Sequence, residues 1–311
     1  MAHRPPARPA SGQCWPISPG RSLLLAMVSA PALAAAAATA QDPGGMGSLA
    51  EYFGFTSLEV IRIGDDAGPL MVADMDGDGL GDLVVANDRE SRIEIHRQRP
   101  GASPEDARPP ADVNEFPEHW RFERRTVPVR HAIGAMAARD FDGDGRMDLL
   151  YAGQPAELVF LRQLPSGGFE VARRHRQPGL VLSRSGLAVA DVLGDEEPEV
   201  LAIVRGEISI LSMNGFDLRP ARVLSAGAPM VALRIADFNG DGRMDVAGLL
   251  ADDPAPVRLW MGGREAGASI LGSQERFELP ALSDARPIRL PGWRMDLLAI
   301  VETRTRRVAV Q

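Results

Sequence analysis

Five copies of one short motif recur along the chain, and their spacing constrains the fold more than any other feature. Three copies are complete: they read DMDGDGLGDLVVA, DFDGDGRMDLLYA and DFNGDGRMDVAGL, and begin at Asp74, Asp140 and Asp237. Two weaker copies begin at Asp191 and Ile288. Aligned on the final acid, the copies are 66, 51, 46 and 51 residues apart, with that acid at Asp82, Asp148, Glu199, Asp245 and Asp296. A repeat of about fifty residues is typical of propeller blades or of a solenoid array.

The pattern within each repeat predicts four short strands. In the first repeat, apolar residues fill 68–73, a β-rich stretch covers 82–86, alternating residues cover 92–96, and a fourth strand fits within 120–129. No long helical periodicity follows the N-terminal region, which disfavours a helical solenoid. The 32 Gly and 25 Pro residues supply many turns. We therefore predict an all-β chain, a β-propeller of four-stranded antiparallel blades.

The two ends of the repeat region are predicted to complement each other, because one has a spare strand and the other lacks one. A lone strand is predicted over 57–63, whereas the chain stops at Gln311, just after a third strand over 307–310. The first of these strands is predicted to complete the last blade and so close a five-bladed ring without an unpaired edge. The alternative is a seven-bladed propeller of which this chain is an incomplete piece.

The complete motifs follow the pattern D-x-[DN]-G-D-G-x-x-D, which predicts a cation site. Carboxylates crowded at positions 1, 3, 5 and 9 repel one another unless a cation lies between them. Oxygen ligands on a flexible loop suit calcium better than magnesium, which prefers a stricter octahedron. An EF-hand is excluded because it needs an acid at position 12, where this chain has Val85, Tyr151 and Gly248.

These loops resemble the calcium loops of the FG-GAP/VCBS repeat family, which includes the head propeller of integrin α subunits. The resemblance covers residues 57–311 and implies that calcium lies in the hairpin between the first two strands of a blade, at about three sites. The implied ligands, with a backbone carbonyl at position 7, are Asp74, Asp76, Asp78, Leu80 and Asp82; Asp140, Asp142, Asp144, Arg146 and Asp148; and Asp237, Asn239, Asp241, Arg243 and Asp245. The copy over 191–199 departs from the pattern at Leu193, Glu196 and Glu199, which leaves a doubtful fourth site. The fifth has Ile288, Leu290 and Gly292 at ligand positions and is expected to bind no calcium. The usual blade number of the family is seven.

The N-terminus has the layout of a secretory signal peptide. Arg4, Arg8 and Arg21 precede an apolar run over 23–38, and small residues at Ala38 and Ala40 mark a cleavage site. We predict a signal peptide over 1–40, a linker over 41–56 and the propeller over 57–311. The alternatives are cleavage after Ala34 and retention of the run as an anchor. The single Cys lies inside the signal, so the mature chain has no disulfide. A bacterial protein that is secreted, periplasmic or at the cell surface is expected, without stable membrane insertion after cleavage.

Charge and motif content limit the function. All 34 basic residues are Arg, against 42 acids, and the net charge of −8 argues against nucleic-acid binding. The chain has no HExxH and no GxSxG motif, so no enzyme activity is predicted. We expect a non-catalytic module that binds an extracellular or periplasmic protein or a glycan, with structural calcium. The alternative is a propeller-fold polysaccharide lyase or hydrolase.

Three further features allow more than one interpretation. Arginines within 121–130 and 173–176 form either a basic stripe for anionic partners or ordinary solvated strand faces. The insertion over 97–119 is either a binding loop or a surface excursion. Trp260 and Trp293 are expected to pack between blades, with carbohydrate stacking as the alternative.

Overall fold

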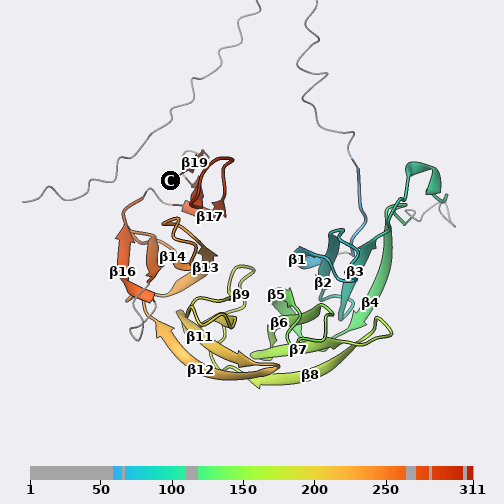
Figure 1. Ribbon diagram of the computed structural model, residues 1–311, viewed down its shortest axis with the longest axis horizontal. Coiled ribbons are helices and arrows are strands. Elements are labelled where there is room, and N and C mark those ends of the chain that lie inside the picture. Colours follow the sequence, from blue (N-terminus) through green and yellow to red (C-terminus); the bar gives the residue numbers. More distant parts are fainter. Residues whose placement is uncertain are drawn as a thin grey trace, which may run out of the picture. The chain divides into compact units, whose positions relative to one another are not determined.

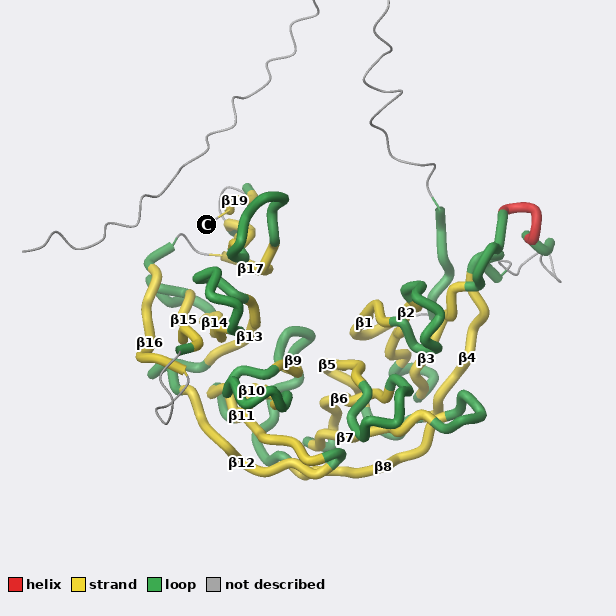
Figure 2. The backbone as a smooth tube through the Cα atoms, viewed as in Figure 1, coloured by secondary structure: helices red, strands yellow, loops and turns green. Residues whose placement is uncertain are grey.

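The structure is a computed structural model that describes residues 59–64, 67–109, 118–263, 271–279, 282–303 and 307–310. Within these residues nearly all regular structure is β-strand, as Figure 2 shows; a short 3-10 helix, η1 (Pro104–Asp106), lies in the insertion between β3 and β4. No described helix has the length and apolarity that crossing a membrane requires. The predicted signal peptide and linker lie outside the described residues.

The strands form five antiparallel sheets, four with four strands and one with three. In each sheet, strands that follow one another in sequence are paired. The first sheet contains β1 (Ala67–Ala73), β2 (Asp82–Asn87), β3 (Arg92–Gln98) and β4 (Phe122–Pro128). The second contains β5 (Ala132–Arg139), β6 (Asp148–Gln154), β7 (Glu157–Gln163) and β8 (Phe169–Arg176). The third contains β9 (Leu187–Ala190), β10 (Glu199–Val204), β11 (Glu207–Asn214) and β12 (Asp217–Leu224). The fourth contains β13 (Met230–Ala236), β14 (Asp245–Leu250), β15 (Val257–Gly262) and β16 (Leu271–Phe277). The fifth contains β17 (Leu282–Ile288), β18 (Leu297–Glu302) and β19 (Val308–Val310).

The sheets are the blades of a five-bladed β-propeller (Figure 1). Consecutive blades contact one another through their first strands, β1 with β5, β5 with β9, β9 with β13 and β13 with β17. The predicted all-β propeller is therefore confirmed. Each sequence motif lies between the first two strands of its blade, so one repeat corresponds to one blade.

Apolar clusters between neighbouring blades hold the blades together. The second strands of the middle blades are buried because a blade lies on either side of them; every residue of β14 is buried, for example. Phe160 on β7 packs edge-on against Phe141, at 5.0 Å between ring centroids, and against Phe216 of the next blade, at 5.7 Å. Trp260 is 4% exposed and belongs to the cluster between the third and fourth blades, as predicted. Trp293 is 51% exposed, so the prediction that it packs between blades is wrong.

The segment expected to close the ring does not form a strand in its described part. Residues 59–63 carry no strand, and the prediction of a strand there is wrong for these residues. Glu59 instead accepts a hydrogen bond from Arg121 at 3.0 Å, and Gly64 lies against the side chains of Asn87 and Glu94. The described part of this segment therefore runs along the first blade, and the described strands of the fifth blade number three.

Candidate metal centre

The acid at position 1 of each complete motif organises its loop. Asp74 accepts backbone N–H bonds from Gly77 at 2.8 Å, Asp78 at 3.2 Å and Gly79 at 2.9 Å. Gly77 and Gly79 have φ of 78° and 84°, a conformation that side-chain-bearing residues rarely adopt. Asp140 and Asp237 accept the same three N–H bonds in their loops, at 2.7 to 3.1 Å. One carboxylate therefore fixes the turn in all three loops.

The acid at position 9 fastens the loop to the third strand of its blade. Asp82, Asp148 and Asp245 are fully buried and begin the second strand, where the sequence predicted them. In each, one oxygen accepts the N–H of the position-2 residue and the other accepts an N–H from the third strand, at 2.6 to 3.2 Å. Burial raises the pKa of all three carboxyls, although these N–H bonds oppose the shift.

The carboxylates of the first two loops converge as a metal site requires. One oxygen each from Asp74, Asp76 and Asp78 lies within 4.8 Å of the others, and so does one each from Asp140, Asp142 and Asp148. In the third loop, Asn239 Oδ1 accepts the N–H of Asp241 at 2.9 Å, so its amide oxygen also points into the turn. These hard oxygen donors, fixed by a shared backbone geometry, fit calcium.

A family profile described as FG-GAP-like repeat matches residues 140–202 and 191–248. Residues 140–248 carry FG-GAP-like repeats. The two matches overlap and cover the second, third and fourth motif copies; the copies that begin at Asp74 and Ile288 lie outside them. None of the curated protein sequences compared with this chain matches it.

Solved structures resemble the chain at low identity. One is BBS1N in its crystal structure with ARL6DN, with 12% identity and a TM-score of 0.48; the similarity covers 80% of this chain and 68% of that one. Another is the biofilm matrix protein Bap1 of V. cholerae, with 16% identity and a TM-score of 0.36, covering 62% of this chain and 26% of that one.

Arginines pair with the acids of the first two complete loops, a feature that was not predicted from the sequence. Arg162 places Nε 2.7 Å from Asp142 Oδ2 and donates from Nη2 to Asp144 Oδ2 at 3.0 Å. Arg146 also donates to Asp144 and, through Nε, to the carbonyl of Gln163 at 3.1 Å. In the first loop, Arg97 Nη1 lies 3.7 Å from Asp76 Oδ2. The signal was present in the sequence, because an Arg-Gln pair ends the third strand of both blades.

The degenerate copies keep the loop shape without the full set of acids. Asp191 accepts N–H bonds from Gly194 at 2.6 Å and from Glu196 at 3.1 Å. Glu199 occupies position 9 and accepts the N–H groups of Val192 and Leu193 on a single oxygen, at 2.9 and 3.2 Å. Its side chain is buried, and this burial raises its pKa to about 7.

In the fifth copy the remaining acid braces a neighbouring blade. Asp296 accepts two hydrogen bonds from Arg289, at 2.7 and 2.9 Å. Asp296 and Asp237 also bond reciprocally: the Asp237 N–H reaches the Asp296 carboxylate at 3.0 Å, and the Asp296 N–H reaches the Asp237 carbonyl at 2.7 Å. This copy thus holds the first residue of the third complete loop in place.

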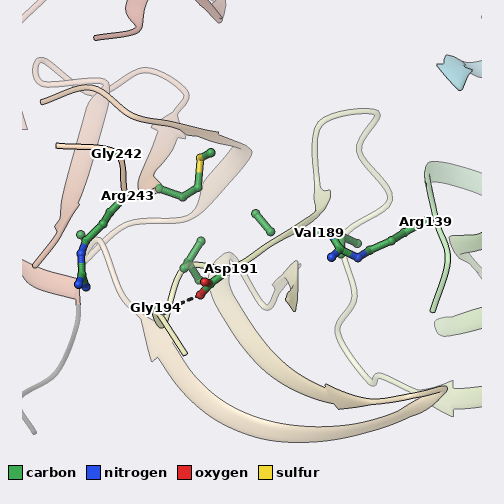
Figure 3. Close-up of a pocket in the computed structure, with 10 residues that line it drawn as sticks. Arg139, Val189, Asp191, Gly194, Gly242 and Arg243 are labelled. Atoms are coloured by element: carbon green, nitrogen blue, oxygen red, sulfur yellow. Dashed lines mark hydrogen bonds between the residues drawn. The ribbon is translucent and has the colours of Figure 1, made fainter. Parts of the chain in front are cut away.

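Two hollows lie beside the loops that join first and second strands. The first, about 410 Å³, is lined by loop residues of the third and fourth blades, by β9 and by Arg139. Figure 3 shows Arg139 extending toward Val189, while the side chain of Arg243 points away from Asp191. The second, about 390 Å³, is lined by Asn239, Gly240 and residues 292–295. The position-7 N–H groups of Leu80, Arg146 and Arg243 donate to the position-5 acids at 2.8 to 3.0 Å; ligation by their carbonyls stays a prediction.

Proposed function

We propose that this chain is an exported, non-catalytic β-propeller whose calcium loops support a binding face for a protein or glycan. The observation that carries the proposal is the convergence of three carboxylate oxygens within 4.8 Å in each of the first two loops. Such a group of acids is destabilising without a compensating positive charge. When bound, calcium would supply that charge and link the loop to the start of the second strand. The chain's own residues hold the turn and fix the donors.

The proposed binding face is the end of the propeller that carries the loops between first and second strands. Residues of these loops line both hollows, so the shape of each hollow depends on the order of its loops. Exposed apolar side chains lie beside them: Trp293 and Leu290 in the fifth copy and Met244 in the third complete loop. Exposed aromatic and apolar groups around a hollow are typical of binding surfaces. Binding is therefore expected to weaken when the loops lose calcium.

The absence of a catalytic role is part of the proposal. A Tyr–His–Glu chain does occur: Tyr151 Oη lies 3.0 Å from His131 Nδ1, and His131 Nε2 lies 3.2 Å from Glu157 Oε2. Tyr151 is 2% exposed and His131 is 7% exposed, which leaves no room for a substrate. Both imidazole nitrogens have partners, as in a structural brace. We infer that this chain of groups ties β6 and β7 to the segment before β5.

Export is proposed from the signal-like N-terminus. It also suits the loops, because calcium modules outside cells work at roughly 0.1 to 1 mM ion, whereas cytosolic free calcium is far lower. Partly exposed loops of modest affinity would be filled only outside the cytoplasm.

A thermal melt of the full chain tests the calcium part of the proposal. One site that is saturated at one hundred times its Kd adds about 2.7 kcal/mol, and each kcal/mol is worth roughly 2–4 °C in a domain of this size. Chelation should lower the Tm by about 5–10 °C per site, with recovery in calcium and poor recovery in magnesium. Asp76→Asn should shrink this shift, whereas Glu170→Gln, an exposed acid on β8, should leave it intact. An unchanged Tm after chelation would refute the proposal.

A further inference from the structure

The three complete loops differ in the residue at one equivalent position near the end of the third strand. Gln98, Gln163 and Gly262 donate the backbone N–H that holds the position-9 acid in the first, second and fourth blades. The residues just before them are Arg97, Arg162 and Met261, at the end of β3, β7 and β15. The chain therefore presents one loop geometry with a guanidinium nearby in two cases and a methionine at the equivalent strand position in the third.

Only in the second loop does the arginine engage two of the predicted ligands. Arg162 lies 2.7 Å from a carboxylate oxygen of Asp142 and 3.0 Å from one of Asp144. Arg97 pairs with only one described acid of the first loop: its Nη1 lies 3.7 Å from Asp76 Oδ2. The hydrogen bond to Asp144, together with the charge of Asp142, raises the pKa of Arg162, so the guanidinium stays charged.

The second loop also has the best-compensated charge. Two of its four acids, Asp142 and Asp144, form ion pairs with the guanidinium groups of Arg146 and Arg162. In the third complete loop, Arg243 instead donates a hydrogen bond to the Gly263 carbonyl at 2.6 Å and forms no ion pair with the described acids of that loop. A cation that enters the second loop must compete for carboxylates that are already engaged in charge-assisted contacts.

We propose that Arg162 is a tethered cation that competes with calcium for Asp142 and Asp144, so that the second loop binds calcium more weakly than the first. The same contact keeps the loop closed when the ion leaves, because the guanidinium supplies compensating charge. This inference rests on the proposed function, since it concerns the affinity of one of the proposed calcium sites.

A calcium titration of the full chain, with glycine-selective ¹⁵N labelling, reports each loop separately. The paired glycines Gly77/Gly79, Gly143/Gly145 and Gly240/Gly242 donate to the position-1 acids of the three loops, so their amide signals follow occupancy. In Arg162→Met, which copies Met261, the calcium midpoint of the second loop should fall about tenfold, the size expected for a charge-assisted contact that is partly exposed. The midpoints of the other two loops should not move. Arg174→Met, which removes an exposed arginine of β8 in the same blade, should change none of the three.

The outcomes separate the two proposals. An equal second-loop midpoint in Arg162→Met and Arg174→Met would overturn the competition while calcium binding at the other loops stands. A chain in which no loop responds to calcium, with or without Arg162, would overturn both. If the methionine variant fails to fold, Arg162→Gln, which also lacks the charge, should show the same fall in midpoint, and an unchanged midpoint there would count equally against the inference.

Discussion

Glu199 should make the stability of the propeller fall as the pH rises through neutrality. The side chain is 1% exposed, and its burial raises the pKa from 4.5 to about 7, against the opposing effect of the Val192 and Leu193 N–H groups. Between these two values the folded chain retains a proton that the unfolded chain releases, so rising pH favours unfolding. A displacement of this size corresponds to about 3 kcal/mol, of which about 2.5 kcal/mol falls between pH 5 and pH 8.

Glu199→Gln should remove this dependence while it preserves the loop. A single oxygen of Glu199 accepts both N–H groups, and the Gln carbonyl can do the same. Urea unfolding at pH 5 and pH 8, in chelator, measures the free energy of unfolding of wild type and variant. Relative to wild type, the variant should gain about 2.5 kcal/mol on going to pH 8. Glu197→Gln, an exposed neighbour, should track the wild type; an identical pH dependence in Glu199→Gln and wild type would refute the reasoning.

The remaining predictions concern one brace and two tryptophans. Asp245→Ala should lower the free energy of unfolding by about 3 kcal/mol in chelator, because it leaves the N–H groups of Phe238 and Gly262 without their hydrogen-bond acceptor. A loss below about 1 kcal/mol would contradict the bracing role. Trp260→Ala should cost about 3–5 kcal/mol in urea unfolding, because it opens a cavity between two blades. Trp293→Ala should stay within about 0.5 kcal/mol of wild type, and a larger loss would show that its exposed ring packs in solution.

The blades could be predicted from the sequence because the motif fixes both a turn and a strand start. Asp74 and its glycines determine the hairpin locally, and Asp82 begins the next strand, so the copies place β2, β6, β10 and β14 without any tertiary information. Apolar residues on both sides of these motifs then favour strands buried between sheets. Local chemistry thus accounts for the architecture.

What the sequence left open depends on contacts between distant segments. The alternating pattern over 57–63 favours a strand but does not specify a neighbour; the ion pair of Glu59 with Arg121, 62 positions away, and the fit of Gly64 against Asn87 place its described part along the first blade. Likewise, Trp293 was expected inside because tryptophan is usually buried, yet it lies in a loop between first and second strands, where no neighbouring sheet covers it.

The five copies show how one hairpin tolerates very different charges. In every copy a backbone geometry must be held, and an aspartate that accepts loop N–H groups holds it in the first four. The excess negative charge of the acids must be compensated as well, and the means of compensation differs between copies. The second surrounds its acids with guanidinium groups, the third raises the pKa of its buried acid, and the fifth keeps one acid paired with Arg289. The first loop has a single arginine at 3.7 Å, and among the described residues the acids of the third complete loop make no ion pair. Calcium dependence should therefore be concentrated in the first and third complete loops, and loss of the ions there should loosen the first and fourth blades before the second.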